Sequence, residues 1–263
     1  MSLVDSVRGV IVRRALLNYR IDPAVAQRLL PAPFRPQLLH GHAIGGICLI
    51  RFRALRPWFL PSSFGLTSEN AAHRIAVEWD VDGQTRQGVF VPRRDTDAWF
   101  QQTFGGRLFP GIHQRSEFQI RETASELDLR VVREDGGEEL ALTGKQAVSL
   151  PADSVFASMA EASEFFQRGA VGYSPTNQPG HFHGIRLACR DWQMEPLTVQ
   201  QARSRFFDDT SRFPAGSVHL DSALVMRNLE HTWHSEPDLA AAGATIVPKR
   251  ARSHTRATFA LRA

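Results

Sequence analysis

The sequence predicts a β-rich α+β fold, and three observations lead to this prediction. Apolar and polar residues alternate over many short segments, which is typical of strands that bury one face. Turn-forming pairs such as Asp82-Gly83 separate several of these segments, as they do in β-hairpins. Helical spacing is confined to a few short stretches, so we expect a large sheet with small peripheral helices.

The composition is that of a globular chain with one large domain. The 263 residues are 43% hydrophobic and 22% charged, which allows a sizeable core. Proline and glycine are spread evenly, and the sequence has no internal repeat, low-complexity segment or linker. We therefore expect residues 1–263 to form a single domain.

The charge pattern argues against a nucleic-acid or membrane partner. The formal net charge is +4, but 27 acidic residues are distributed among 31 basic ones, and the densest basic patch, residues 249–252, is short. The N-terminal segment lacks the apolar core of a signal peptide, and no run approaches about 18 apolar residues. Cys48 and Cys189 lie in apolar surroundings and are expected to be free thiols. These features predict a cytoplasmic protein.

The N-terminal part predicts two long strands and one short helix. Residues 7–21 mix apolar and basic side chains in a manner that suits a strand entering a sheet. The pair Asp22-Pro23 then caps a short helix that has proline at its first position and runs to about residue 30. The nearly continuous apolar and glycine residues of 43–52 indicate a buried strand. The proline- and aromatic-rich residues 57–65 are expected to form a surface loop, with a lid over a pocket as one option.

A strand and a hairpin open the central part of the sequence. Mainly apolar residues occupy the odd positions of residues 73–81, and charged residues occupy even positions. The pair Asp82-Gly83 tolerates positive φ and should reverse the chain into a second strand over residues 86–91. Pro92 has no backbone N–H for the ladder, so we expect it to end that strand or to lie at an edge.

A short helix and a glycine-rich loop follow the hairpin. Asp95 and Thr96 are predicted to cap a helix over residues 97–103, which two glycines then close. The loop of residues 105–111 contains three glycines, a proline, an arginine and a phenylalanine. This density of special residues predicts a functional loop rather than a neutral connector.

The second half of the chain predicts a β-meander, one helix and further strands. A hairpin signal at residues 135–137 joins two strands of the meander. Helical spacing over residues 151–168 indicates a helix that Gly169 ends, and residues 171–184 are predicted to be a loop. The predicted strands cover residues 118–120, 127–131, 139–150, 185–192, 217–233 and 251–262.

Several of these pieces resemble the acetoacetate decarboxylase-like superfamily. The matching segments are the central stretch 68–113, residues 18–31 with the run Asn-Tyr-Arg-Ile-Asp-Pro, and residues 206–227 with the run Phe-Phe-Asp-Asp. Within this superfamily the chain is similar to the uncharacterised YqjF-like branch. The resemblance implies a strongly bent antiparallel sheet or cone-like barrel with short peripheral helices. Barrel interiors of this size commonly hold a small ligand.

The resemblance also implies a chemical difference. In decarboxylases of this superfamily, a lysine directly after a proline in the glycine-rich loop forms a Schiff base with the keto substrate. Gly111 stands at that place in this sequence, and the two lysines of the chain are Lys145 and Lys249. Because a Schiff base needs a deprotonated amine in the pocket, we expect no imine chemistry.

Glu69 and His113 are the candidate catalytic residues, because the resemblance places their segments at the pocket. Glu69 matches the pocket glutamate of the superfamily. Such a carboxylate beside arginines acts as a base or forms an ion pair that holds two strands together, and both interpretations stay open. The candidate substrate-binding residues are Arg74, Arg94, Arg107, Arg115, Gly111 and Phe109.

Other polar groups favour structural interpretations. His181 and His183 lie close together, but nothing nearby completes the three or four ligands that zinc needs, so no metal site and no cofactor is predicted. Asp208 and Asp209 are expected to cap backbone N–H groups. His73 is expected to be a core histidine.

Two classes of function follow from these observations. One is a lyase- or hydratase-type enzyme for an organic acid or other carbonyl compound, with Glu69 as acid–base group and arginines of residues 93–115 orienting the anion. The other is a non-catalytic ligand-binding or scaffold protein that kept the barrel. Convergent arginines and a free Glu69 would favour the enzyme, whereas a fully paired Glu69 and an apolar pocket would favour the alternative. The sequence determines neither the substrate nor whether the chain forms a homo-oligomer.

Overall fold

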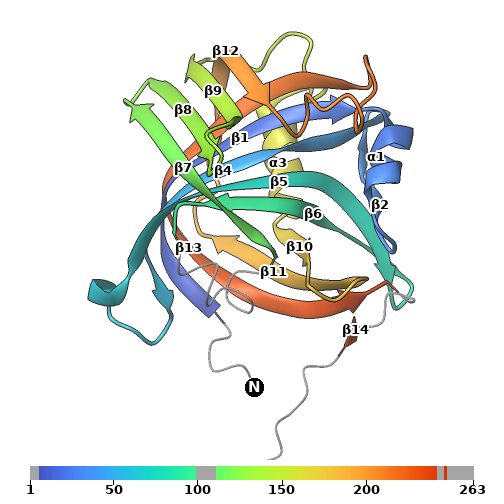
Figure 1. Cartoon of the computed structure of the whole chain (residues 1–263), viewed down its shortest axis with the longest axis horizontal. Helices are drawn as coiled ribbons and strands as arrows, with labels where there is room; N and C mark the ends of the chain where they lie inside the picture. The colour runs from blue at the N-terminus through green and yellow to red at the C-terminus, as the bar shows by residue number, and fades with distance from the viewer. Residues whose placement is uncertain (1–5, 99–110, 242–245, 248–263) are drawn as a thin grey trace, which may run out of the picture.

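The fold is built from one curved sheet with two helices beside it, as seen in a computed structural model that describes residues 6–98, 111–241 and 246–247 (Figure 1). Among these residues the sheet contains 14 strands. Their bounds are β1 (Ser6–Ile21), β2 (Arg35–Pro36), β3 (Leu38–Leu39), β4 (His42–Pro57), β5 (Leu66–Val81), β6 (Gln84–Thr96), β7 (His113–Glu122), β8 (Glu126–Arg133), β9 (Glu138–Gln146), β10 (Val171–Pro175), β11 (His181–Cys189), β12 (Glu195–Ser204), β13 (Val218–Ala240) and β14 (Ile246–Val247).

Two helices flank the sheet, and both begin with the caps that the sequence supplies. In α1 (Pro23–Leu29), the side chain of Asp22 accepts hydrogen bonds from the N–H groups of Ala24 and Val25, as predicted. The helix expected over residues 151–168 is shorter, because turns occupy its first part and Ser158 is the N-cap of α3 (Met159–Arg168). Within the described residues, neither helix is long and apolar enough to cross a membrane.

Additional strand pairings close the sheet into two rings that share a wall. The main path through the sheet is β11-β10-β6-β7-β8-β9-β12-β13-β1-β4-β5-β2, and β11 also pairs with β13 while β6 also pairs with β5. We call the circuit β13-β1-β4-β5-β6-β10-β11 the small ring. The circuit β13-β1-β4-β5-β6-β7-β8-β9-β12 is the large ring. Because successive side chains of a strand point to opposite faces, the shared strands present one face to each ring.

The predicted strong bend is confirmed, and the pairing is antiparallel with two exceptions. Strand β10 pairs with β6 in parallel, with Gly172 opposite Val89, and β6 pairs with β7 in parallel, with Arg94 opposite His113. The sheet is therefore mixed rather than purely antiparallel. The second parallel pairing brings the start of β7 directly beside the end of β6.

The prediction that Pro92 ends its strand or lies at an edge is wrong, because β6 continues to Thr96 and has paired strands on both sides. The pairing of β6 with β5 skips a residue around this proline: Phe90 lies opposite Ile75, and Arg93 lies opposite His73. This is the pattern of a β-bulge, where a missing N–H is tolerated. Of the helix predicted over residues 97–103, only the first two residues are described, and they are not helical.

The segment predicted as a loop over residues 171–184 instead contains β10 and the start of β11. Strand β12 was not predicted, because its residues show little apolar alternation. The meander β7–β9 is confirmed. The strand predicted over residues 251–262 lies outside the described residues.

Separate apolar clusters fill the two rings. The cluster of the small ring includes Leu16 of β1, Phe52 of β4 and Phe166, through which α3 packs against the sheet. The cluster on the opposite face includes Leu17 of β1 and Leu49 of β4. Neighbouring residues of one strand thus enter different cores, which confirms the alternation expected for a wall shared by two rings.

Candidate functional site

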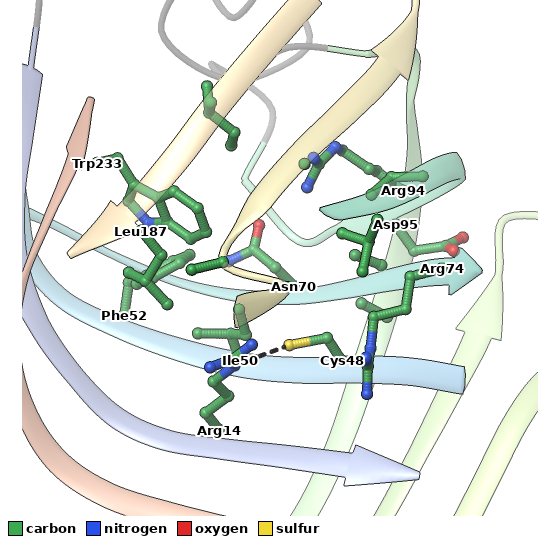
Figure 2. A pocket seen from close by; sticks show the side chains of 18 of the residues that line it. Arg14, Cys48, Ile50, Phe52, Asn70, Arg74, Arg94, Asp95, Leu187 and Trp233 are labelled. Carbon is green, nitrogen blue, oxygen red and sulfur yellow. Dashed lines mark hydrogen bonds between the residues drawn. The ribbon is translucent and has the colours of Figure 1, made fainter. Parts of the chain in front are cut away.

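A cavity of about 80 Å³ lies within the small ring (Figure 2). All seven strands of that ring contribute to its walls, and β7 adds His113. Since roughly 10–15 Å³ of this kind of volume holds one water, the cavity has room for several waters or for a small organic molecule. Apolar side chains form much of the wall, as in other small-molecule sites. They include Ile50, Phe52, Val89, Val91, Ile185, Leu187 and Trp233.

Three arginines from three strands of the small ring line the cavity: Arg14 of β1, Arg74 of β5 and Arg94 of β6. The first two are 7% and 5% exposed, and Arg94 is partly exposed. None of them forms an ion pair with a carboxylate of the described residues, although other arginines of the chain do. Three guanidinium groups therefore share one small cavity without an ion-pair partner among the described residues.

The guanidinium of Arg14 contacts two sulfur atoms and one aromatic ring. Its Nε–H donates to Cys48 Sγ at 3.3 Å, and its Nη1 lies 3.8 Å from Met226 Sδ. The guanidinium carbon is 4.9 Å from the centre of the Trp192 ring. Sulfur is a weak acceptor, and a ring face offers only a cation–π attraction, so these contacts orient the cation without neutralising it.

Arg74 and Arg94 have neutral partners as well. Arg74 donates from Nη2 to Asn18 Oδ1 at 2.8 Å and packs over the Phe166 ring at 4.7 Å, while its buried Nε has no hydrogen-bond partner. Burial lowers the pKa of Arg74 to about 10, and the charge of Arg14 acts in the same direction. Arg94 donates from Nε and Nη2 to Ser174 Oγ at 3.3 and 3.1 Å. Both arginines keep donors for a further acceptor.

The bulge at Pro92 determines which arginine of β6 faces the cavity. Val89 and Val91 line it from odd positions, whereas beyond the bulge it is Arg94, at an even position, that lines it. Arg93 is then turned to the opposite face, where it forms ion pairs with Asp95. One extra residue in the strand thus re-aims the side chain that follows it.

His113 lies beside Arg94 at the rim of this site. Burial, together with the positive charge of Arg94, lowers its pKa to about 4. The imidazole is therefore neutral near pH 7, where it presents one donor and one acceptor nitrogen. The structure thus brings together three of the residues that the sequence singled out, namely Arg74, Arg94 and His113.

Gly111 packs against the same group of side chains. Its φ of +104° is in the region that favours glycine. A Cβ atom at this position would lie 2.9 Å from Ser174 Cβ and 3.3 Å from Arg94 Nε. No side chain fits there unless Ser174 or Arg94 moves. Lys145, the one lysine among the described residues, pairs with Glu126 on β8 and does not line the cavity.

We expect Gly111→Ala to lower the free energy of unfolding by more than the about 1–2 kcal/mol that left-handed backbone costs an L-residue, because Ser174 and Arg94 must also move. Affinity for carboxylate ligands should fall with it. Gly136→Ala is the matched control, since Gly136 has a φ of +79° and open space around it. Urea unfolding and ligand titration measure both. Equal effects of the two substitutions would contradict a specific role for Gly111.

Glu69 lies on the opposite face of β5 from Arg74 and is not among the residues that line the cavity. It belongs to β5, which begins at Leu66 rather than at residue 73 as predicted. Arg13 Nη2 donates to Glu69 Oε2 at 2.6 Å, and Arg51 Nε is 3.5 Å from Oε1. Burial raises the pKa of Glu69, and the charge and hydrogen bond of Arg13 lower it. This geometry favours the ion-pair interpretation that the sequence left open.

We expect Glu69→Gln to lower the free energy of unfolding by about 1.5–3 kcal/mol, the range for a hydrogen bond between charged groups. The loss is limited because Arg13 keeps a second partner, Glu122 Oε2, at 3.1 Å. Carboxylate affinity should stay unchanged, since Glu69 faces away from the cavity. Isothermal titration of the variant checks this, and a loss of ligand affinity at unchanged stability would restore Glu69 as a site residue.

The remaining candidates divide between the surface and the part of the chain that is not described. Arg115 is exposed on β7 and does not line the cavity. Arg107 and Phe109 lie outside the described residues. Three other residues that line the cavity were not predicted from the sequence: Arg14, Cys48 and Asn70. Arg14 could have been found from the pair Arg13-Arg14, which lies inside an apolar strand. Neighbouring residues of a strand point to opposite faces of the sheet, so such a pair places one cation on each face.

A second buried polar cluster lies across the wall from the cavity. His73 is fully buried against Phe206, and neither ring nitrogen forms a hydrogen bond, although Nδ1 is 3.8 Å from Asp95 and Nε2 is 3.7 Å from Glu139. Burial lowers the pKa of His73 to about 4; the charge of Asp95 raises it, and that of Arg93 lowers it. His73 is thus a core histidine, as predicted, but it is not a hydrogen-bonded one.

The other predicted polar groups have structural contacts. His181 and His183 belong to β11 rather than to a loop, and His183 Nδ1 is 3.0 Å from Asp238. Across the described residues, no group of three or more His, Cys, Asp or Glu side chains is arranged to hold a metal ion. Asp208 and Asp209 accept hydrogen bonds from backbone N–H groups, which confirms their predicted capping role. Cys48 and Cys189 are free thiols, as expected.

Comparison with known proteins identifies the fold. Residues 12–225 match the family model DUF2071, which is described as an uncharacterised conserved protein. The chain is also similar to the crystal structure of acetoacetate decarboxylase from Legionella pneumophila, with a TM-score of 0.58 and 12% identity over 89% of this chain and 88% of that one. A search of curated proteins gave no match.

Two further structures show the same likeness. An acetoacetate decarboxylase-like enzyme from Sphingomonas wittichii RW1 aligns with a TM-score of 0.55 and 13% identity, covering 88% of this chain and 91% of that chain. The enduracididine biosynthesis enzyme MppR, in complex with pyruvate, aligns with a TM-score of 0.54 and 12% identity, covering 90% and 89%. At these identities the likeness establishes the fold alone.

Proposed function

The chain belongs to the uncharacterised DUF2071 family of the acetoacetate decarboxylase-like superfamily, and from this premise we propose that it binds a small organic acid in the small-ring cavity. The observation that supports this most strongly is the convergence of Arg14, Arg74 and Arg94 without a carboxylate partner among the described residues. Unpaired buried cations are costly, and a bound anion offsets that cost.

The neutral groups of the cavity suit the rest of such a ligand. Guanidinium groups bind carboxylates through two parallel hydrogen bonds. Asn70 and the neutral imidazole of His113 supply partners for a carbonyl or hydroxyl oxygen, and the apolar wall accepts a short carbon chain. MppR, which shares the fold, has been crystallised with pyruvate, an acid of this size.

For an enzymatic role we propose a lyase- or hydratase-type reaction without an imine. His113 is the group suited to move a proton, because it is neutral and next to Arg94. In an enolising step, the imidazole would take a proton from the carbon beside a carbonyl, and the electron pair would move onto the carbonyl oxygen. The cavity arginines would stabilise the negative charge that develops on that oxygen.

A non-catalytic binding protein is the second candidate, and a specific observation favours it. Glu69, the acid expected to act in catalysis, is paired with Arg13 on the other face of β5. The convergent arginines favour the enzyme, and the paired Glu69 favours the binding protein. The two functions differ in turnover, so NMR detection of hydrogen exchange at the methyl group of pyruvate in heavy water separates them.

Calorimetric titration tests the binding that both functions require. We expect pyruvate to bind at least tenfold more tightly than pyruvamide, its uncharged isostere, because hydrogen bonds between charged groups contribute about 1.5–3 kcal/mol. Treatment with pyruvate and borohydride should leave the intact mass unchanged. Equal affinity for the two compounds would overturn the proposal, and an adduct on Lys145 or Lys249 would restore amine catalysis.

A further inference from the structure

We propose that the natural ligand of the small-ring cavity carries two anionic groups on a short carbon chain. One group would be bound by Arg14 and Arg74, and the other by Arg94 on the opposite wall. This inference rests on the proposed function and adds to it the number and the spacing of the ligand's charges.

The charge balance of the cavity favours a ligand with more than one negative group. Three guanidinium groups line it, and Asp95 is the one acidic residue among its described lining residues. The carboxylate of Asp95 is already engaged, because it accepts two hydrogen bonds from Arg93, at 3.0 and 2.8 Å, and one from Ser116 Oγ at 3.0 Å. A ligand with a single carboxylate would leave two of the three cavity cations without a countercharge.

The three cations are anchored on two different walls. Arg14 is held from β4 and β13, through the sulfur atoms of Cys48 and Met226. Arg94 is held from β10, through Ser174. In the order of the sheet, β4 and β5 separate the strand of Arg14 from the strand of Arg94. Figure 2 shows the two arginines reaching into the cavity from opposite sides in this view, with the amide of Asn70 between them.

Hydrogen bonding groups Arg74 with Arg14 rather than with Arg94, because Arg74 Nη2 donates to Asn18 Oδ1 at 2.8 Å and Asn18 lies on β1, the strand of Arg14. The positive charge of Arg14 contributes to the lowered pKa of Arg74, whereas the pKa of Arg94 is lowered by burial. Arg94 in turn lowers the pKa of His113. The cavity thus has a two-arginine end and a one-arginine end.

The size of the cavity limits the chain between the two anionic groups. The cavity volume of about 80 Å³ exceeds the roughly 10–15 Å³ that a single water needs and is less than three times the about 30 Å³ that a water occupies in the liquid, so a short chain is favoured. Malonate and succinate, with three and four carbons, are the short dicarboxylates that this limit favours. Asn70 would then lie beside the middle of the ligand, where it can bind a hydroxyl or carbonyl substituent.

Calorimetric titration of the wild-type protein with succinate and with butyrate tests the inference. These acids have the same carbon chain and differ by one carboxylate. We expect succinate to bind at least tenfold more tightly than butyrate at equal ionic strength. Glutarate should bind more weakly than succinate, because the cavity is short. This comparison needs no variant, so it does not depend on how any substitution folds.

Substitutions then locate the second anionic group. In Arg94→Met we expect the affinity for succinate to fall to about that for butyrate, whereas Arg115→Met, an exposed arginine of β7, should leave both affinities unchanged. Succinate binding no more tightly than butyrate would overturn the two-anion inference and leave the proposed function standing. An advantage of succinate that persists in Arg94→Met would also overturn it. If neither acid nor pyruvate binds, the proposed function itself fails.

Discussion

Replacing Arg13 by methionine is expected to lower the free energy of unfolding by about 3–5 kcal/mol, whereas the same replacement of its neighbour Arg14 should leave it unchanged or raise it. The guanidinium of Arg13 is fully buried and pairs with Glu69 at 2.6 Å and with Glu122 at 3.1 Å. Its loss would leave two carboxylates without their main partner. Arg14 has no carboxylate partner among the described residues, so its removal leaves no buried charge unpaired.

Ligand binding should respond in the opposite way. Arg14 lines the cavity and Arg13 does not. We therefore expect Arg14→Met to lower the affinity for pyruvate at least tenfold, and folded Arg13→Met to bind pyruvate with the affinity of the wild type. Urea unfolding and calorimetric titration of the two variants give both quantities. If the two variants lose equal stability, or if Arg14→Met binds pyruvate as tightly as the wild type does, the proposal that the cavity arginines bind a ligand is contradicted.

The second large effect is a loss of stability in mild acid that His73 should cause. Its folded pKa, about 4, is below the ordinary value of about 6.5. Between these values the unfolded chain binds a proton that the folded protein excludes, so the free energy of unfolding falls as the pH falls from about 6.5 to 4. From pH 7.5 to pH 5, this single histidine should remove about 2 kcal/mol.

A His73→Gln variant isolates this contribution. Burial raises the pKa of Glu139, and a carboxylate of this kind shifts stability in the opposite direction over part of the same range. We therefore compare the variant with the wild type by urea unfolding at pH 7.5 and pH 5. The wild type should lose about 2 kcal/mol more than the variant between the two values. Equal losses in the two proteins would show that His73 is protonated in the folded state as readily as in the unfolded chain.

Much of the fold could be predicted from local patterns, because most of its strands are adjacent in sequence to a partner. The alternation of residues 73–81 and the Asp82-Gly83 pair predict β5, its turn and β6 without any long-range information. The closure of the rings could not be predicted in this way. It depends on pairings such as β11 with β13, whose partners are distant in sequence.

The face on which a side chain lies was the hardest property to predict for the site. In a strand, a shift of one residue moves a side chain to the other face. The resemblance placed the segment of Glu69 at the pocket, but its neighbour Asn70 is the residue that lines it. Arg94 was predicted as a site residue, yet its face depends on the bulge at Pro92, which the sequence suggested was a strand end.

Long-range pairing also explains why Arg14 was missed. Its strand, β1, pairs with β4 and with β13, and only these two partners bring Cys48 and Met226 to its side chain. An arginine pair in an apolar segment signals two buried cations, but it does not show which of them has carboxylate partners. That distinction separates the ion pair of Arg13 from the unpaired guanidinium of Arg14.

The most direct test of a ligand site at the three arginines is a crystal structure of the protein with succinate or pyruvate at a saturating concentration. We expect density for the acid inside the small ring, with carboxylate oxygens at about 2.7–2.9 Å from guanidinium nitrogens of Arg14, Arg74 or Arg94. An acid bound elsewhere, or a small-ring cavity that holds only water under these conditions, would contradict this account.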